Sequence, residues 1–272
     1  MAVFLLLLSL FGVAWSDIYR HLEYVDSVAF NSSMGQGAQG NFLFRMGIPF
    51  NSSGAIDYSD LSSQFNIASI LGLSLYNFPP QPYLIDMCFL THETDDIQKE
   101  QAFFDKNPTE GEFIHWPIFG LNFTFIQQVC AQIGIPASEC PSEQPRNFTE
   151  ANKAKLAVQF FDTLQVDDMV NRLAQARSFL EKPNQYGTPS IVFGHCECGC
   201  DRTGQFFASY YMTYWGWTFT KAMSYDVLII QRNPTYKHIV ATEWYCEYLR
   251  AKGEYSAQDC GDCEPFQCSG SE

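Results

Sequence analysis

Residues 195–204 read His-Cys-Glu-Cys-Gly-Cys-Asp-Arg-Thr-Gly, a segment that places a thiol six positions before a guanidinium. The backbone N–H groups of residues 197–202 can curl into a nest that binds an anion, and a following helix adds the positive end of its dipole. The planar fork of Arg202 can hold two phosphoryl oxygens, which a lysine would not reproduce. The same field favours a thiolate, so Cys196 is predicted to attack phosphorus and form a phosphocysteine.

The other residues of this segment are predicted to bind the phosphate of the substrate. They are Glu197, Cys198, Gly199, Cys200, Thr203 and Gly204. Gly199 allows a turn where a Cβ would crowd the ligand, and Thr203 is expected to hydrogen-bond the sulfur while water hydrolyses the phosphocysteine. A cluster of His and Cys residues that binds metal or forms disulfides is the competing interpretation of the same pattern. We expect no metal and no cofactor.

The pattern His-Cys-x-x-Gly-x-x-Arg-Thr, residues 195–203, resembles the signature of the cysteine-dependent protein tyrosine and dual-specificity phosphatases. Its Gly-x-Asp-Arg-Thr-Gly ending is most similar to atypical secreted bacterial-type tyrosine and lipid phosphatases. Myotubularin-like and Sac-type phosphoinositide phosphatases share the Asp-Arg-Thr portion. The strong resemblance covers residues 190–211. It implies an α/β fold and a metal-free reaction in which Cys196 and Arg202 are catalytic.

The leaving oxygen needs a proton, and three aspartates compete to supply it. Asp201 matches the position that serves as acid or water-orienting group in relatives with the Asp-Arg-Thr ending, and it is the favoured candidate. Asp162 lies 34 positions before Cys196, a spacing similar to that of the mobile-loop acid of ordinary tyrosine phosphatases. Asp86, at the end of an expected strand, is the third candidate. The alternative roles are structural: a helix cap for Asp201, a surface charge for Asp162 and a strand-end cap for Asp86.

The chain has ten cysteines, and their parity constrains the site. If all ten pair, Cys196 is oxidised and the site is inactive. If Cys196 is free, at least one other cysteine is unpaired as well. Reversible inactivation through a disulfide between Cys196 and Cys198, or another nearby thiol, is the hypothesis that follows. Residues 259–272 contain three of the cysteines and are expected to form a small cross-linked tail.

Two elements must position the candidate loop. Residues 189–193 read as a buried strand that enters the loop of residues 194–204, and residues 205–224 read as a central helix that is aromatic nearly all round. Before them, Asp167 or Asp168 is expected to cap a helix that ends ahead of Pro183. A helix, a buried strand, a Gly-containing loop and a buried helix are typical of α/β folds that bind ligands at the carboxyl ends of their strands.

Further elements complete the expected architecture. Residues 82–89 and 111–116 are predicted strands, and residues 122–133 and 149–164 are predicted helices, the second capped by Thr149. The fold class is therefore α/β, with a central, largely parallel sheet flanked by helices and a Cys-rich C-terminal tail. One phosphatase-like domain is expected over residues 17–258.

Residues 1–16 resemble a signal peptide, with an apolar run too short to span a bilayer, so no stable membrane anchor is expected. Four glycosylation sequons follow, at Asn31, Asn51, Asn122 and Asn147. Ten cysteines also suit an oxidising compartment. These features predict a glycoprotein that is secreted or resides in the lumen of the secretory or endolysosomal pathway.

The composition narrows the partners. The chain of 272 residues carries a net charge of −14, which opposes binding to nucleic acid. The loop has Glu197 and Asp201 but no lysine, so a singly phosphorylated ester is expected, most of all phosphotyrosine in a protein or a small phosphomonoester. Phosphoinositides or inositol phosphates are the alternative substrates. A catalytically silent secreted protein, with Cys196 in a disulfide, is the alternative from another class; the oligomeric state stays open.

Overall fold

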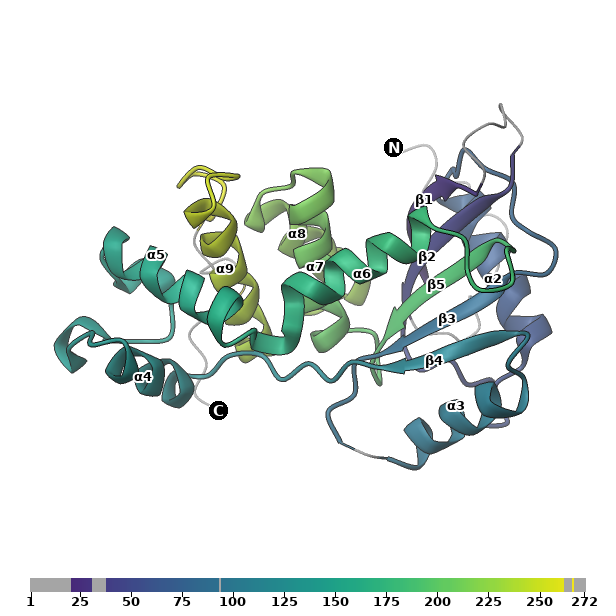
Figure 1. The fold of residues 1–272 in the computed structure, drawn as a ribbon, viewed down its shortest axis with the longest axis horizontal. Helices are drawn as coiled ribbons and strands as arrows, with labels where there is room; N and C mark the ends of the chain where they lie inside the picture. The colour runs from purple at the N-terminus through teal and green to yellow at the C-terminus, as the bar shows by residue number, and fades with distance from the viewer. Residues whose placement is uncertain (1–20, 31–37, 93, 262–265, 267–272) are drawn as a thin grey trace.

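The computed structural model describes residues 21–30, 38–92, 94–261 and Phe266. The fold is α/β, as the sequence predicted, with a five-stranded sheet of order β1-β2-β5-β3-β4 flanked by helices (Figure 1). The strands are β1 (Glu23–Ala29), β2 (Gly40–Met46), β3 (Tyr83–Cys88), β4 (Gly111–His115) and β5 (Ser190–His195). Among these five described strands, β1 and β2 pair antiparallel and the other three pairs are parallel. The predicted signal peptide, Asn31, and most of the predicted tail lie outside the described residues.

Eight α-helices accompany the sheet in the described part of the chain. They are α2 (Tyr58–Leu71), α3 (Asp95–Lys106), α4 (Phe123–Gln132), α5 (Glu150–Val158), α6 (Met169–Glu181), α7 (Asp201–Trp215), α8 (Phe219–Ile230) and α9 (Tyr236–Ala251). Helices α2 and α3 lie on one side of the sheet and α6 and α7 on the other, while α4, α5, α8 and α9 gather beyond α7 (Figure 1). None of the helices described combines the length and apolar character that a membrane span requires.

Strand β5 shows why the sheet is buried on both faces. Its Ile191 and Phe193 pack in the apolar cluster with Phe65 of α2, whereas Val192 between them packs in the cluster that contains Phe206 of α7. Successive side chains of a strand point to opposite faces, so a strand covered on both sides reads as an unbroken apolar run. This run made β5 predictable, and the strands predicted at residues 82–89 and 111–116 are confirmed as β3, which is also fully buried, and as the partly buried edge strand β4.

The two predicted surface helices are also confirmed. The Asn122 side chain accepts the Phe125 N–H at 2.9 Å, and the Thr149 side chain accepts the Asn152 N–H at 3.3 Å. Each bond satisfies one of the N–H groups that a helix start leaves without an intrahelical partner. After α5 the chain continues as a π-helix over Gln159–Thr163.

The single helix predicted over residues 205–224 is wrong. Helix α7 ends at Trp215, and Gly216 follows with a φ of +63°. Helix α8 then begins at Phe219, where the Thr218 side chain accepts the Lys221 N–H at 3.2 Å. A glycine in the left-handed region is a common helix end. The aromatic pattern hid this end because residues on both sides of Gly216 are apolar.

The predicted cap of α6 is also absent. Asp168 stands at the cap position, but its side chain makes no hydrogen bond to the first backbone N–H groups and instead accepts from Asn171 Nδ2 at 2.6 Å. The Asp167 side chain leaves the helix and binds a different segment. Both aspartates have a positive φ, of 52° and 46°. Such backbone is costly for residues other than glycine, and it often accompanies a functional constraint.

Candidate active site

The predicted loop, residues 196–200, joins the carboxyl end of β5 to the start of α7. Because β5 lies between β2 and β3, the loop stands at the middle of the sheet edge where three parallel strands end. Cys196 is 1% exposed and is a free thiol. The structure therefore places the predicted nucleophile where α/β folds commonly bind ligands.

Three successive carbonyl oxygens of the loop, those of residues 197, 198 and 199, accept hydrogen bonds from groups outside it. The donors are, in that order, the Ile48 N–H at 3.2 Å, His21 Nδ1 at 2.7 Å and Arg45 Nη2 at 3.0 Å. A planar trans peptide points its N–H away from its carbonyl, so the N–H groups of residues 198–200 face the opposite side. Among the described residues, no acceptor binds a backbone N–H of residues 197–203. These amides can bind an anion.

Helix α7 adds to the same anion site. Its cap residue, Cys200, makes no side-chain hydrogen bond to the helix start, and the Gly204 N–H closes the first turn on the Cys200 carbonyl at 2.8 Å. The N–H groups of residues 201–203, at the N-terminus of α7, therefore have no hydrogen-bond partner in the described chain. The positive end of the helix dipole lies at this point. A phosphate there would take the place of a cap.

Glycine is required at position 199 because of the neighbouring backbone, and the reason differs from the predicted one. Its φ is +73°, and a Cβ at this position would lie 2.5 Å from the Met46 carbonyl oxygen and 2.8 Å from the Gly47 nitrogen. The clash is with the end of β2 and not, as predicted, with the ligand. Any larger residue would push the loop off its support.

A buried ion pair holds the loop from behind. Arg45, in the middle of the hydrophobic sheet, binds Gly199 and also places Nη2 2.5 Å from Oδ1 of Asp226 on α8; both side chains are fully buried. A Cβ at Gly204 would lie 2.5 Å from Asp226 Oδ2, so the first turn of α7 packs directly on this carboxylate. The ion pair therefore joins β2, α8 and the loop.

Arg202 and Thr203 keep unused hydrogen-bonding groups. Arg202 donates from Nη2 to Thr91 Oγ1 at 3.1 Å, in the segment after β3. Its Nε, and Oγ1 of Thr203, are buried and find no hydrogen-bond partner among the described residues. Buried polar groups without partners are uncommon in folded proteins. They fit a site in which a ligand supplies the missing oxygens.

One strand end, one loop and one helix start thus bring together a free thiol, a guanidinium and backbone N–H groups that have no acceptor in the described chain. No protein-family model matches the chain, and no curated protein matches it in sequence.

The favoured proton donor, Asp201, is engaged elsewhere. Arg232 grips its two carboxylate oxygens at 2.9 and 2.8 Å, and the Thr235 N–H donates to Oδ1 at 2.6 Å. Burial alone would raise the pKa of Asp201, but the bonds from Arg232 and Thr235 outweigh it, and the pKa is lowered. This favours the ionised carboxylate, which suits orientation of the loop or of water better than donation of a proton.

The other two predicted acids lie apart from the loop opening. Asp162 is in the π-helix after α5, where it accepts from Lys252 at 2.6 Å and from Tyr248 at 2.8 Å, and the Lys252 bond lowers its pKa. Asp86 is fully buried in β3, 2.9 Å from His195 Nε2. The structure therefore brings neither carboxylate to the anion site.

Asp167 is a candidate that the sequence analysis missed. Its carboxylate accepts the Phe119 N–H at 2.8 Å, the Gly120 N–H at 3.1 Å and Gln205 Nε2 at 2.8 Å. Gln205 is on α7, one turn after Arg202. Burial raises the pKa of Asp167 despite these three bonds. The sequence offered only a capping position, since the contact with Gln205 depends on the tertiary fold.

The structure describes eight of the ten cysteines, and Cys263 and Cys268 lie outside the described residues. Disulfides join Cys130 to Cys140, Cys198 to Cys200 and Cys246 to Cys260, and Cys88 and Cys196 are free. The hypothesised bond between Cys196 and Cys198 is absent, because Cys198 pairs with Cys200. Cys260 pairs with α9 rather than within the tail. Three disulfides indicate an oxidising environment.

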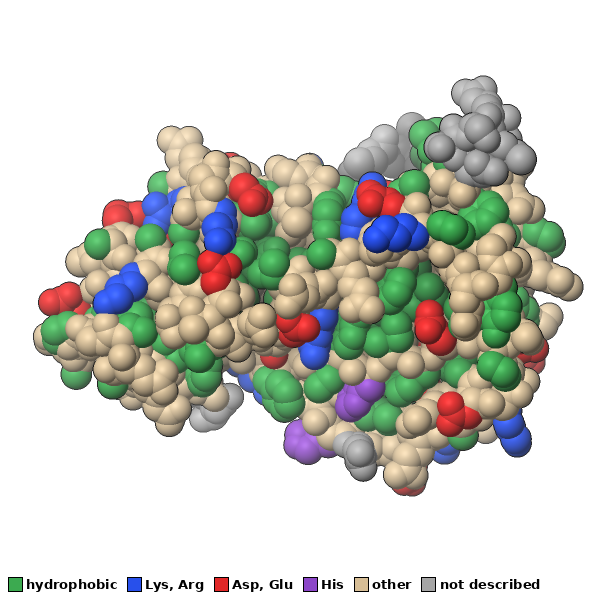
Figure 2. Space-filling model, in the orientation of Figure 1, with side chains coloured by type: hydrophobic (Ala, Val, Ile, Leu, Met, Phe, Trp, Pro, Cys, Tyr) green, Lys and Arg blue, Asp and Glu red, His purple; other side chains and the backbone are tan. Residues whose placement is uncertain are grey.

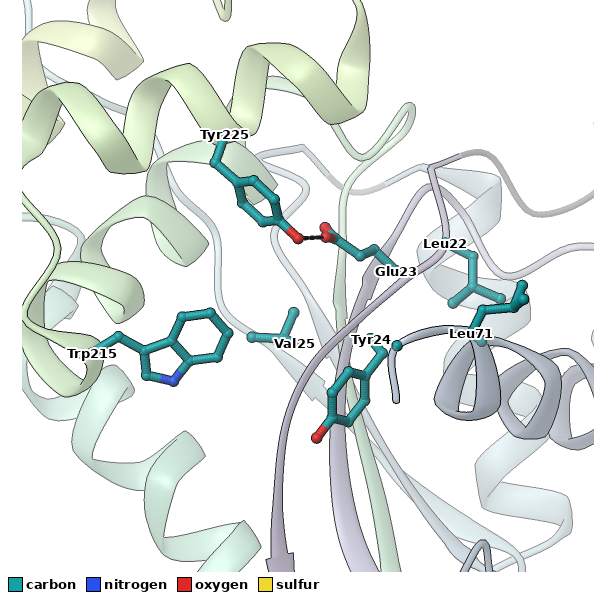
Figure 3. A pocket seen from close by; sticks show the side chains of 9 residues that line it. Leu22, Glu23, Tyr24, Val25, Leu71, Trp215 and Tyr225 are labelled. Carbon is teal, nitrogen blue, oxygen red and sulfur yellow. Dashed lines mark hydrogen bonds between the residues drawn. The ribbon is translucent and has the colours of Figure 1, made fainter. Parts of the chain in front are cut away.

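A separate pocket of about 360 Å³ lies where the start of β1 meets α2 and α8 (Figure 3). The Tyr225 hydroxyl points at the Glu23 carboxylate and donates to it. Burial raises the pKa of Glu23 to about 7, against the nearby charge of Arg45. The described residues that line this pocket include no thiol and no imidazole. It therefore lacks a nucleophile of the kind found in the loop.

Proposed function

We propose that the protein is a phosphatase that hydrolyses phosphomonoesters through a phosphocysteine on Cys196. The observation that supports this most is the set of N–H groups of residues 197–203 that have no acceptor among the described residues and lie around a free, buried thiol. The outward binding of the loop carbonyls orients those amides without a ligand present. Preorganised donors of this kind stabilise charge that develops on phosphoryl oxygens.

The reaction would proceed in two displacements. The loop amides and the guanidinium of Arg202 bind the phosphoryl oxygens, and Sγ of Cys196 attacks phosphorus in line. The S–P bond forms as the bond from phosphorus to the leaving oxygen breaks, and a carboxylic acid protonates that oxygen. Water then attacks phosphorus, the S–P bond breaks, and inorganic phosphate and the Cys196 thiolate are released. The unpartnered Thr203 hydroxyl is the group that would hydrogen-bond this departing thiolate.

We infer that Asp167 is a better candidate than Asp201 for the acid. A proton donor must be protonated near the working pH, and burial raises the pKa of Asp167 while Arg232 lowers that of Asp201. Gln205 connects Asp167 to the first turns of α7. Asp201 then has the role of fixing Arg232, whose Nη2 lies 3.6 Å from Sγ of Cys198 in the loop.

The proposed substrate carries a single phosphate, with phosphotyrosine in a protein as the favoured case. Glu197 is exposed beside the thiol, and the charge of Asp201 is paired with Arg232, so Glu197 is the carboxylate that would repel a highly charged ligand. On the face shown in Figure 2, basic and acidic side chains are interspersed with apolar ones, without a continuous basic area. A membrane of anionic lipids would favour such an area.

The proposed location is the secretory pathway or the outside of the cell. The disulfides require an oxidising environment, and the sequons at Asn122 and Asn147 are on exposed side chains. The apolar leader of residues 1–16 supports the same route.

Hydrolysis of an aryl phosphate by the full chain, with and without reductant, tests the proposal. Because Cys196 is a free thiol, we expect the wild type to turn over without reductant and Cys196→Ser to lose turnover. A double variant, Cys130→Ser with Cys140→Ser, removes two sulfurs remote from the loop and should retain activity. Equal activity of Cys196→Ser and the wild type would overturn the proposal.

The same assay separates the substrate classes. We expect faster turnover of a phosphotyrosine peptide than of soluble inositol phosphates or phosphoinositide vesicles. Turnover confined to the inositol compounds would favour the alternative class. A wild type that binds inorganic phosphate but never turns over, in either redox condition, would indicate the silent binding protein.

A further inference from the structure

Four side chains with metal-binding chemistry meet directly behind the phosphate loop. They are Asp86 and Cys88 of β3, His195 at the end of β5, and Glu100 of α3. All four are buried at 0% exposure. The proposed phosphatase reaction uses none of them, although His195 immediately precedes the nucleophile.

The sheet register explains why these residues meet. Asp86 and Cys88 are two positions apart on β3, so their side chains share one face of the sheet. Cys88 is the direct neighbour of His195 in the parallel pairing of β3 with β5. Helix α3 lies on this side of the sheet (Figure 1) and brings Glu100 to the same point.

The ligand atoms are close enough to share one ion. His195 Nε2 lies 2.9 Å from Oδ1 of Asp86 and 3.2 Å from Oε2 of Glu100. One ligand atom each from Cys88, Glu100 and His195 lies within 4.8 Å of the other two. Asp86 joins this group of three through its contact with His195, and thiolate, imidazole and carboxylate are the ligands of tetrahedral zinc sites.

The same atoms have no adequate partners without an ion. Among the described residues, the carboxylate oxygens of Asp86 and Glu100 and the ring nitrogens of His195 have no hydrogen-bond partner outside this cluster. One imidazole nitrogen carries at most one hydrogen, so Nε2 cannot donate to both carboxylates that approach it. Two buried carboxylates are thus left with one shared cation, an arrangement that folded proteins avoid.

We propose that Asp86, Cys88, Glu100 and His195 bind one Zn²⁺ ion. Thiolate sulfur, imidazole nitrogen and carboxylate oxygen are the ligands that zinc takes in proteins, and four protein ligands make a closed, structural site. On binding, the Cys88 thiol releases its proton and His195 coordinates through neutral Nε2. The ion joins β3, β5 and α3 beneath the loop and holds the residue before Cys196. This inference does not depend on the proposed phosphatase activity.

Metal analysis of the full chain, purified without chelator, tests the inference. We expect one Zn²⁺ per chain by elemental mass spectrometry. Refolding with Co²⁺ should give a thiolate-to-cobalt charge-transfer band that Cys88→Ser loses and Glu100→Gln weakens. The matched control, Cys263→Ser with Cys268→Ser, removes the two tail cysteines outside the described residues and should keep both the zinc and the band.

Two results would overturn the inference, and both are independent of how well the ligand variants fold. The first is a folded wild type with substoichiometric transition metal and no charge-transfer band after refolding with Co²⁺. The second is loss of the metal in the tail control, which would assign the ion to Cys263 and Cys268.

Discussion

At the residue scale, Gly199 has the most restricted environment in the loop. Its positive φ and the Met46 carbonyl, 2.5 Å from the position of a Cβ, allow no side chain. Its own carbonyl accepts from Arg45, so any shift of Gly199 also turns the neighbouring amides. Binding of phosphate and support of the loop therefore depend on the same residue.

Gly199→Ala should lower kcat/KM for an aryl phosphate by about 100-fold or more, because misplaced donors lose most of their effect. Gly187→Ala is the matched control, since Gly187 has a φ of +66° but nothing within 4 Å of its Cβ position. Steady-state kinetics and thermal unfolding of both variants check this. Equal kinetic losses would mean that backbone strain, rather than the clash with β2, is responsible.

Asp167→Asn should reduce turnover of substrates with poor leaving groups by roughly 100-fold, the usual contribution of a general acid. With an activated aryl phosphate, which needs no proton, the loss should be within a few-fold. Because burial raises the pKa of Asp167, the wild type should retain activity to a higher pH than an exposed aspartic acid allows. Asp201→Asn is measured alongside, and a dependence on the leaving group in that variant alone would return the acid role to Asp201.

The sequence predicted those residues of the site that lie close together along the chain. Cys196, Arg202 and Thr203 stand within eight positions, and a strand, a loop and a helix start suffice to bring them together. Asp167 was not predictable because its contact with Gln205 spans 38 positions. The cluster of Cys88, Glu100 and His195 depends likewise on the pairing of β3 with β5, which no local pattern reveals.

At the element scale, β2 supports the loop through Arg45 and Met46, although it was not predicted as a strand. Its residues are buried throughout, and Arg45 interrupts the apolar pattern that identified β5. Arg45 is tolerated inside the sheet because Asp226 of α8 pairs with it. The strand was therefore obscured by the residue that connects it to the loop.

Asp226→Ala should lower the free energy of unfolding by about 3–5 kcal/mol, because Arg45 is then buried without its partner. Replacing both residues with apolar ones, Arg45→Met with Asp226→Leu, should recover part of that loss. Asp96→Ala, which breaks an exposed pair with Lys99, should cost less than about 1 kcal/mol. Urea unfolding measures all three; an equal cost for Asp226→Ala and Asp96→Ala would contradict the role of the buried pair.

At the scale of the whole molecule, the outer helices enlarge a core that the sheet alone would not provide. Helices α4, α5, α8 and α9 gather beyond α7 (Figure 1), and disulfides tie α4 to Cys140 and α9 to Cys260. Buried aromatic residues such as Trp244 and Phe160 fill the space between them. The aromatic content of 16% is explained by this second layer of packing.

The stability of the whole chain should fall as pH rises through neutrality because of Glu23. Burial raises its pKa from 4.5 to about 7, so the folded state holds this proton more tightly than the unfolded chain. The stabilisation is complete below pH 4.5 and is lost as pH rises towards and past 7. Because the carboxylate is buried, a pKa shift from 4.5 to about 7 corresponds to an effect of about 3 kcal/mol.

Glu23→Gln should remove this pH dependence, so that the variant gains stability over the wild type between pH 5 and pH 8. Chemical unfolding across that range measures the difference. Glu254→Gln, on an exposed side chain, is the control and should give a constant difference. A constant difference for Glu23→Gln as well would show that the folded state does not retain the proton of Glu23.

The most direct test of the central claim is to trap the covalent intermediate. The full chain is mixed with an aryl phosphate, quenched in acid within the first turnovers, digested and analysed by mass spectrometry. The account predicts a phosphoryl group on Cys196 in the wild type and none in Cys196→Ser. Hydrolysis of the ester with no phosphoryl group on Cys196, or with one on another side chain, would contradict it.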